Sequence, residues 1–325
     1  MIDILLFIAG IALILFGADR LVEGASGIAR RFGLSEFLIG VTIVGIGTSM
    51  PELVVSFIAA IKGSADITVG NITGSNIFNS MLILGVTSLI MPIAFTKTNI
   101  KRDIPIAMFA ALLLLLFGMD SLIAGKGTPN TISRTEGIVL LLCFVAFMVM
   151  SFKLDTIEGH IEYSTPEDNQ PTKPVNVWIN ILYIAGGLFG LIFGGHLFVN
   201  SAISIAKDLG VSEAIIAITI MAGGTSLPEL ATCIVAAVKK RGQMALGNIL
   251  GSNISNIFLI VGGSAVIRPL TLSPTTSSSL IASSVSIVLI FLSAFTIKKK
   301  VLDRWEGAIF LMLYIAYIVY LTLNQ

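Results

Sequence analysis

The sequence is poor in charged residues and in cysteine, and each shortage excludes a class of protein. Only 12% of the 325 residues are charged and 55% are apolar, so the long apolar runs cannot all be hidden in a soluble core. The net charge is +1, and no basic stripe with interleaved aromatic residues occurs, which argues against nucleic-acid binding. The composition predicts a polytopic membrane protein.

The two cysteines and two histidines form no motif for chemistry. Cys143 and Cys233 lie within apolar runs and lack CxxC spacing, so we interpret them as packing residues. The sequence also lacks HExxH, GxGD and a Ser/His dyad, the settings in which an intramembrane protease would place its catalytic groups. We therefore expect a protein that is not an enzyme and that holds no cofactor.

Apolar segments long enough to cross a bilayer recur along the chain. A hydrocarbon core about 30 Å thick needs roughly 20 apolar residues per helix. The first segment carries Asp3 instead of a positive start and has no small-residue cleavage site, so it is interpreted as a retained helix. The predicted spans are 2–22, 35–61, 67–92, 103–123, 135–152, 177–200, 211–238, 243–268, 278–297 and 305–323. The fold class is therefore an all-α polytopic membrane protein with ten transmembrane helices.

One polar stretch divides the spans into two sets of five. Residues 153–176 hold five acidic residues and three prolines, as a hydrophilic linker does. The predicted units are 1–152, the linker 153–176, and 177–325. The linker is too short for a folded regulatory domain, so regulation through such a domain is not expected.

The two halves contain the same sequence. Residues 42–53 read TIVGIGTSMPEL and residues 219–230 read TIMAGGTSLPEL, an offset of 177 positions. The same offset carries VGNITGSNIFN at 69–79 onto LGNILGSNISN at 246–256 without insertion or deletion. Since each half has an odd number of spans, the second copy enters the membrane from the opposite side. The motifs 42–79 and 219–256 therefore belong to inverted repeats.

The basic residues predict the orientation of the chain. Fifteen of the 20 Lys and Arg fall in or beside the loops that follow the odd-numbered spans. By the positive-inside rule these loops and the linker 153–176 are cytoplasmic and both termini are outside. We expect a multi-pass protein in the inner cell membrane of a bacterium or archaeon, with membrane lipid as its surroundings.

Each motif predicts a helix that is broken within the membrane. Pro51 and Pro228 lack an amide hydrogen, so each frees the carbonyl group four residues earlier and interrupts spans 2 and 7. The breaks expose carbonyl groups beside Thr48 and Thr225, and a carboxylate follows each break. Oxygen ligands of this kind suit hard cations.

The companion helices predict close packing around the breaks. Gly70 with Gly74, and Gly247 with Gly251, form GxxxG faces that allow two helix backbones to approach. Two pairs of polar residues, each four positions apart, then lie on one helix face: Ser75 with Asn79, and Ser252 with Asn256. Inverted symmetry brings both sets together at the centre.

Glu52 and Glu229 are the ionisable residues of the two motifs. Insertion scales place an ionised carboxylate at the centre of a membrane helix at about 2.5 to 3.5 kcal/mol, and no basic residue lies nearby in either motif. Bound cations, protons, or both in alternation must therefore hold the two side chains. Two bidentate carboxylates and two carbonyl groups reach the lower end of the calcium coordination range, whereas magnesium would keep several waters. Sodium accepts the same oxygens, and mutually exclusive occupancy would make an exchanger.

GTSMPEL with GNITGSNIFN, and GTSLPEL with GNILGSNISN, resemble the paired alpha repeats of the calcium/cation antiporters, in particular the prokaryotic type of the sodium/calcium exchanger family. The resemblance covers essentially the whole chain and implies electrogenic exchange of calcium for sodium by alternating access. It implies that Glu52 and Glu229 are the central calcium ligands, with Thr48 and Thr225 beside them. Around these, the implied ion-site residues are Ser49, Ser226, Ser75, Ser252, Asn79, Asn256, Gly45 and Ala222.

This sequence departs from the motifs of potassium-dependent and proton-coupled relatives at two places, which bear on the coupling ion. In potassium-dependent relatives an Asp stands where this chain has Asn256, so potassium use is disfavoured. Proton-coupled relatives carry a Glu soon after the GN dipeptide, and both motifs here continue with Gly and Ser instead. A calcium/proton antiporter on the same fold and a cation channel remain the alternative functions. The sequence leaves open the stoichiometry, the direction of transport and the oligomeric state, with a monomer as one option.

The same resemblance indicates which helices move. FGADR at 16–20 maps onto FGGHL at 193–197 with the offset of 177, which makes the first and sixth spans equivalent. The resemblance implies that these two spans slide across a static core.

Overall fold

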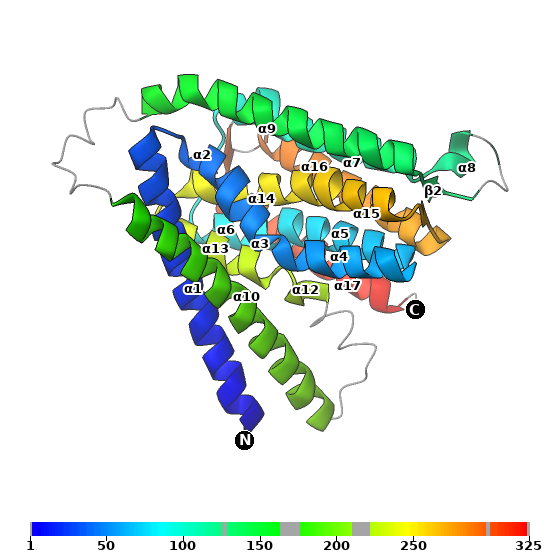
Figure 1. Ribbon diagram of the computed structural model, residues 1–325, viewed down its shortest axis with the longest axis horizontal. Coiled ribbons are helices and arrows are strands. Elements are labelled where there is room, and N and C mark those ends of the chain that lie inside the picture. The colour runs from blue at the N-terminus through cyan, green and yellow to red at the C-terminus, as the bar shows by residue number, and fades with distance from the viewer. Residues whose placement is uncertain are drawn as a thin grey trace.

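The computed structural model describes residues 2–123, 125, 129–162, 176–209, 222–296 and 300–323. Helices dominate this part of the chain, with four two-residue strands (Figure 1). In the first half the elements are α1 Ile2–Phe32, α2 Glu36–Ile39, η1 Gly40–Val44, α3 Gly45–Thr48, α4 Met50–Lys62, α5 Ala65–Ile77, η2 Phe78–Ile83, α6 Leu84–Ile90, β1 Ile93–Ala94, η3 Asn99–Asp103, α7 Ile104–Phe117, α8 Asp120–Ile123, β2 Thr131–Ile132 and α9 Arg134–Glu162. In the second half they are α10 Val177–Asp208, α12 Ala222–Gly224, α13 Leu227–Val238, α14 Gly242–Ser255, η6 Asn256–Val261, α15 Gly262–Ile267, β3 Leu270–Thr271, α16 Pro274–Ser293, β4 Val301–Leu302 and α17 Arg304–Leu323.

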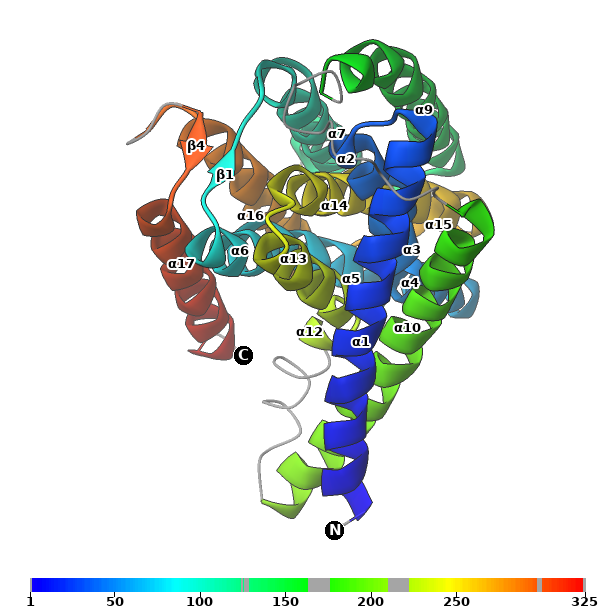
Figure 2. The same ribbon diagram turned by 90° about the vertical axis from the view of Figure 1, so that its left-hand side faces the viewer.

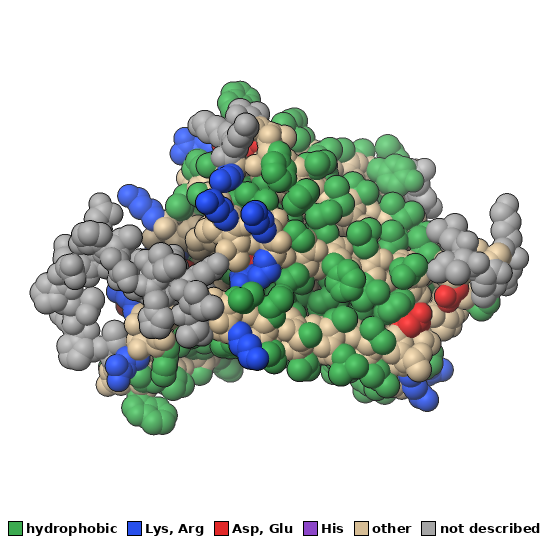
Figure 3. All heavy atoms as spheres, turned by 90° about the horizontal axis from the view of Figure 1, so that it is seen from above, with side chains coloured by type: hydrophobic (Ala, Val, Ile, Leu, Met, Phe, Trp, Pro, Cys, Tyr) green, Lys and Arg blue, Asp and Glu red, His purple; other side chains and the backbone are tan. Residues whose placement is uncertain are grey.

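The described helices have the length and composition of membrane spans. Seven are long and apolar enough to cross a bilayer, and the bent pair Glu36–Thr48 with Met50–Lys62 gives up to eight. At two further predicted spans, 103–123 and 211–238, the described helices α7 and α13 have only 14 and 12 residues. Figure 3 shows hydrophobic side chains across much of one face, with most of its Lys and Arg side chains toward one end. The chain is an all-helical, multi-pass membrane protein.

Several predicted boundaries differ from those observed. Helix α1 continues ten residues beyond the predicted end at residue 22, and α9 continues to Glu162, so the first ten residues of the predicted linker are helical. Polar side chains do not end a helix whose backbone hydrogen bonds are intact, which is why composition placed these ends too early. Residues 163–175 of the linker and 211–221 of the seventh predicted span lie outside the described residues.

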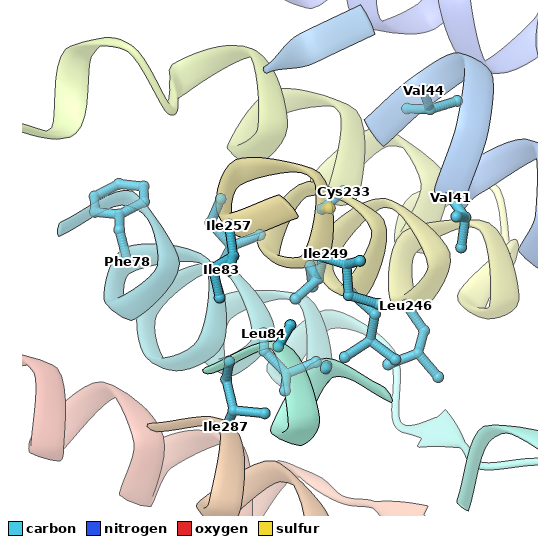
Figure 4. Packing of buried hydrophobic residues seen from close by; sticks show 14 of the residues in the cluster. Val41, Val44, Phe78, Ile83, Leu84, Cys233, Leu246, Ile249, Ile257 and Ile287 are labelled. Atoms are coloured by element: carbon cyan, nitrogen blue, oxygen red, sulfur yellow. The ribbon is translucent and has the colours of Figure 1, made fainter. Parts of the chain in front are cut away.

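The two motif helices form the centre of the bundle. In the most apolar 18-residue stretch of α5–η2–α6, 78% of the residues are buried, and in that of α14–η6–α15 the share is 83%. The corresponding shares in α1 and α17 are only 22% and 17%. Buried apolar side chains from both halves meet here, among them Leu84, Ile249 and Ile257 (Figure 4). The core is therefore built from the duplicated segments, and the less buried helices surround it.

Glycines on α14 allow the predicted close packing against the second span. A Cβ atom added at Gly247 would lie 2.3 Å from the Phe37 carbonyl oxygen, and one at Gly251 would lie 2.5 Å from the Val41 Cα. This half of the GxxxG prediction is confirmed. For Gly70 and Gly74 no described atom lies within 4 Å of an added Cβ. The segment that the repeat would place there, 214–218, lies outside the described residues, so this half remains a prediction.

Short antiparallel strands link the two halves of the chain. β1 pairs with β4, Ile93 opposite Leu302, and β2 pairs with β3, Ile132 opposite Leu270. Each pair therefore joins one strand from each half.

The helices that follow β2 and β4 begin in the same way. Capping boxes open both: the Ser133 amide donates to Glu136 Oε2 at 2.7 Å, and the Asp303 amide donates to Glu306 Oε2 at 2.8 Å. Next to each cap, Arg134 donates to the Val266 carbonyl group and Arg304 to that of Leu89, which closes the ends of α15 and α6. The two halves thus repeat their end contacts, with an offset of 170 residues here, from 134 to 304.

Helices α1 and α10 form a separate pair. They lie side by side along their lengths and extend away from the other helices toward the N-terminus (Figures 1 and 2). A Cβ atom added at Gly187 would lie 2.6 Å from the Leu21 amide nitrogen and 2.7 Å from the Gly17 carbonyl oxygen. The backbones therefore touch, as in other membrane helix pairs with small residues at the interface.

Replacing Gly187 with Ala is expected to destabilise the protein by about 1–3 kcal/mol, because α1 must move away from α10 to accept the methyl group. Gly186, the preceding residue, is the matched control, since no described atom lies within 4 Å of a Cβ added there. Thermal unfolding in detergent measures the difference. Equal midpoints for Gly187→Ala and Gly186→Ala would contradict this account of the interface.

Candidate cation site

Both predicted helix breaks are present among the described residues. Ser49 separates α3 from α4 with φ −80° and ψ 8°, and the two helical segments meet at 48°. Ser226 holds the equivalent place before α13 with φ −90° and ψ 7°. In both helices the proline occupies the first turn, where its missing amide hydrogen costs no helical hydrogen bond. The proline thus starts the second helical segment, and the residue before that segment carries the break.

The two carboxylates lie in the first turns of these second segments. Glu52 is 0% exposed and Glu229 is 1% exposed. The N-terminal turn of a helix presents unpaired amide groups and the positive end of the helix dipole, which favours a negative charge there. The fold therefore supplies part of the stabilisation that these buried carboxylates need.

Each broken helix bonds to the carboxylate of the other. Ser49 Oγ donates to Glu229 Oε1 at 2.9 Å, and Ser226 Oγ donates to Glu52 Oε1 at 3.0 Å. The two serines are 177 residues apart, as are the two glutamates. The motif segments of the two halves therefore meet at one centre through reciprocal contacts.

Ser75 and Asn256 complete one side of this centre. Ser75 Oγ lies 2.9 Å from Ser226 Oγ and donates to Glu52 Oε1 at 3.4 Å. Asn256 Nδ2 donates to Ser75 Oγ at 3.2 Å and to Asn76 Oδ1 at 3.0 Å. The sequence-predicted Ser75 and Asn256 therefore contact each other across the two halves.

Asn79 and Ser252 also make contacts between the two halves. Asn79 Nδ2 donates to Asn253 Oδ1 at 3.2 Å, and Ser252 Oγ donates to the Gly45 carbonyl oxygen at 3.2 Å. Asn79 lies in η2 and Asn256 begins η6, so both asparagines occupy π-helical segments, which are frequent at functional sites. Ala222 begins α12, and its side chain lies outside the described residues.

Sequence reasoning missed Asn76, Asn253 and Asn248. Asn76 donates to the Asn253 carbonyl oxygen at 3.3 Å, 177 residues away, so the GSN tripeptides of the two copies contact each other. Asn248 Oδ1 accepts a hydrogen bond from the Thr48 hydroxyl group at 3.3 Å. All three residues belong to the duplicated motifs, so the repeat itself was the available signal.

Oxygen atoms without partners gather among these residues. The buried side-chain atoms without a hydrogen-bond partner in the described part include Glu52 Oε2, Glu229 Oε2, Asn79 Oδ1, Asn256 Oδ1 and Thr225 Oγ1. A buried polar atom left unpaired costs about 1–3 kcal/mol, and an unpaired charge costs more. The two amide oxygens can only accept hydrogen bonds, and so can the two carboxylate oxygens when the glutamates are ionised. A bound cation would therefore satisfy these four atoms.

Among the described residues no Lys or Arg forms an ion pair with Glu52 or Glu229. The acidic partners in the ion pairs found there are Asp19, Glu23, Glu36 and Asp103. No group of three or more His, Cys, Asp or Glu able to hold a metal occurs in the described ranges either. The chemistry available is therefore two carboxylates surrounded by neutral hydroxyl, amide and carbonyl oxygens, which are ligands for calcium and other hard cations.

Comparison with known proteins agrees with this geometry. The family model of the sodium/calcium exchanger protein matches residues 2–153 and 179–323. The chain is similar to the sodium/calcium exchanger MaX1 of Methanosarcina acetivorans, 31% identical over 98% of both chains, and to the inner membrane protein YrbG of Escherichia coli, 34% identical over 83% of this chain and 81% of that protein. Its fold is similar to a structure of the sodium-calcium exchanger NCX_Mj soaked with Na⁺ and Ca²⁺, with a TM-score of 0.81, 31% identity and 98% of both chains covered. The chain belongs to the sodium/calcium exchanger protein family.

Proposed function

We propose that this protein is a secondary antiporter that exchanges calcium for sodium across the membrane by alternating access, with an electrogenic cycle. The observation that carries the proposal is the pair of buried glutamates, Glu52 and Glu229, each with one oxygen bonded to a serine of the other half and one oxygen without a partner. The family membership and the names of the similar exchangers support it.

In the calcium-loaded state Glu52 and Glu229 would share one ion. Both carboxylates binding through two oxygens, with the carbonyl groups of Thr48 and Thr225, would give six oxygen ligands, the lower end of the calcium range of about 6–8. The ion would displace the serine hydroxyl groups from the two carboxylates. Magnesium is disfavoured because it retains its waters, for which a buried site of protein oxygens leaves little room.

Sodium would bind when calcium leaves. The flanking residues Ser49, Ser226, Ser75 and Ser252 offer hydroxyl oxygens, and Gly45 and Ala222 offer carbonyl groups in the equivalent places of the two copies. Asn79 and Asn256 would line the centre, where their Oδ1 atoms have no partner. Because the same carboxylates serve both ions, calcium and sodium would exclude each other.

The architecture assigned to this function is two inverted five-helix repeats, 1–152 and 177–325, joined by the cytoplasmic linker 153–176. The reciprocal strand pairs and the repeated capping boxes support ten spans related by inversion. The separate pair α1–α10, packed backbone to backbone, would slide over the static core to open the site alternately to each side.

The orientation rests on charge and on the relatives. The excess of basic residues in loops after odd-numbered spans places those loops in the cytoplasm and both termini outside. The similar Escherichia coli protein YrbG is an inner membrane protein, which supports a location in the inner cell membrane.

Calcium uptake into sodium-loaded proteoliposomes diluted into sodium-free buffer tests the proposal. Uptake is expected only when the sodium gradient is present, and an inside-positive potential should accelerate it, because more positive charge leaves with sodium than enters with calcium. Liposomes without protein and liposomes with equal sodium on both sides are the controls. Uptake driven only by a proton gradient would assign the proton-coupled function, and uptake without any counter-ion gradient would indicate a channel.

A further inference from the structure

Asn248 lies outside the set of ion-site residues but contacts both broken helices. It is 1% exposed on α14, and its amide oxygen accepts from the Thr48 hydroxyl group at 3.3 Å and from the Ser252 hydroxyl group at 3.4 Å. These hydroxyl groups share their hydrogens with backbone carbonyl oxygens of the second span, Thr48 with that of Val44 at 3.0 Å and Ser252 with that of Gly45 at 3.2 Å. Its amide nitrogen donates to Thr232 Oγ1 at 2.8 Å and to Cys233 Sγ at 3.3 Å. All the hydrogen-bonding capacity of the Asn248 amide is therefore used.

Thr232 continues this path to the second carboxylate segment. Its hydroxyl group donates to the carbonyl oxygens of Pro228 at 2.7 Å and Glu229 at 3.0 Å. One amide side chain thus connects the end of α3, at Thr48, to the first turn of α13, which carries Glu229. Both ends of this path belong to the proposed calcium site.

The other copy does not make the equivalent connection. Asn71, the counterpart of Asn248, donates to Ser56 Oγ at 3.0 Å and to the Glu52 carbonyl oxygen at 3.4 Å. Thr225, the counterpart of Thr48, has a buried hydroxyl oxygen without a partner. The sequence explains part of the difference, since Val55 stands where the second copy has Thr232 and offers no hydroxyl group.

We infer that Asn248 is a positioning residue of the cation site: it holds Thr48 and couples the break in the second span to the Glu229 segment. The inference deepens the proposed function and rests on it for the calcium readout. The Thr48 side of the site is fixed by this amide, whereas the Thr225 side is not fixed by Asn71.

A double-mutant cycle in calcium binding tests the coupling. Thr48→Val and Asn248→Ala are each expected to weaken calcium binding by about tenfold, and the double variant by little more, because both single variants remove the same hydrogen bond. The matched cycle of Thr225→Val with Asn71→Ala should give losses that multiply, since no bond joins these side chains. Multiplied losses at Thr48 and Asn248, or equal coupling in the two cycles, would overturn the inference.

Thr232→Val is the variant that keeps folding and shape while it cuts the path to Glu229. It is expected to weaken calcium binding by about threefold to tenfold and to lower the thermal midpoint of the cation-free protein by a few degrees, because Asn248 loses one buried acceptor and keeps its other contacts. An affinity equal to that of the unaltered chain would count against the path through Thr232.

Hydrogen exchange in the cation-free protein gives a readout that does not need calcium. Asn248→Ala should speed amide exchange at residues 45–50, whereas Asn71→Ala should not speed exchange at that break. Exchange at this break unaffected by Asn248→Ala would overturn the inference by itself. Absence of calcium binding by the unaltered chain would defeat the proposed function instead, so the two failures are distinguishable.

Discussion

Replacing Glu52 or Glu229 with Gln is expected to abolish sodium-driven calcium uptake while the protein still folds. Gln keeps the size of the side chain and can still accept from the serine of the other half, but it removes one negative charge from a buried site that contains only two. Calcium affinity in oxygen sites depends on the number of charged ligands, so we expect a loss of at least about 100-fold for each single variant. Calcium uptake in proteoliposomes and calcium titration of the purified variants measure this loss.

Glu306 offers a matched control for these two substitutions. It is a buried glutamate, 5% exposed, that caps the start of α17 and lies outside the site. Gln also fits a capping box, so Glu306→Gln should leave calcium affinity unchanged. Wild-type uptake by both Glu52→Gln and Glu229→Gln would refute the shared calcium site, whereas equal losses in all three variants would point to general misfolding.

The centre of the site could be predicted from the sequence because the duplication is exact in length. An offset of 177 at both motifs indicates equivalent helices, and the predicted odd number of spans per copy indicates inversion, so the two glutamates are predicted to meet from opposite sides. The structure places Ser49 on Glu229 and Ser226 on Glu52, which is the reciprocal contact that such symmetry demands. The roles of these residues as ion ligands remain predictions that the substitutions above test.

Contacts between the ends of the helices could not be predicted in the same way. The offset falls from 177 at the motifs to 170 at Arg134 and Arg304, because the loop before α17 is shorter than the loop before α9. A search at the offset of 177 reaches β1 and β3 but passes over β2, β4 and the two capping boxes, which repeat at 170. Strands of two residues also carry no periodic pattern, so only their pairing partners define them.

The asymmetry of the site is a further feature that the repeat concealed. Thr48 and Thr225 are identical residues in identical motifs, yet only Thr48 has a hydrogen bond to the asparagine of the other copy. The asparagines also differ in their neighbours, since Thr232 accepts from Asn248 and the equivalent residue in the first copy is Val55, which has no hydroxyl group. Symmetry thus located the two carboxylates correctly but could not assign equal surroundings to the threonines beside them.

Acid is expected to inhibit exchange by competition between protons and calcium for Glu52 and Glu229. A protonated carboxyl group loses its charge and one of its acceptor oxygens, so each proton bound must leave before the ion can be held. The calcium concentration for half-maximal uptake should therefore rise as pH falls, by up to about tenfold per pH unit for each proton displaced. Uptake rates over a calcium titration at several acid pH values measure this shift.

Competition between protons and calcium predicts that the maximal uptake rate does not change with pH. Saturating calcium should restore the uptake rate at acid pH, because the ion displaces the protons from the same oxygens. A fall in the maximal rate with unchanged calcium affinity would contradict competition and would locate the acid effect outside the two carboxylates. An outward proton gradient that drives uptake without sodium would go further, since the protons would then be the coupling ion. Acid inhibition relieved by calcium, together with dependence on a sodium gradient, is the combination that two carboxylates shared between calcium and sodium require.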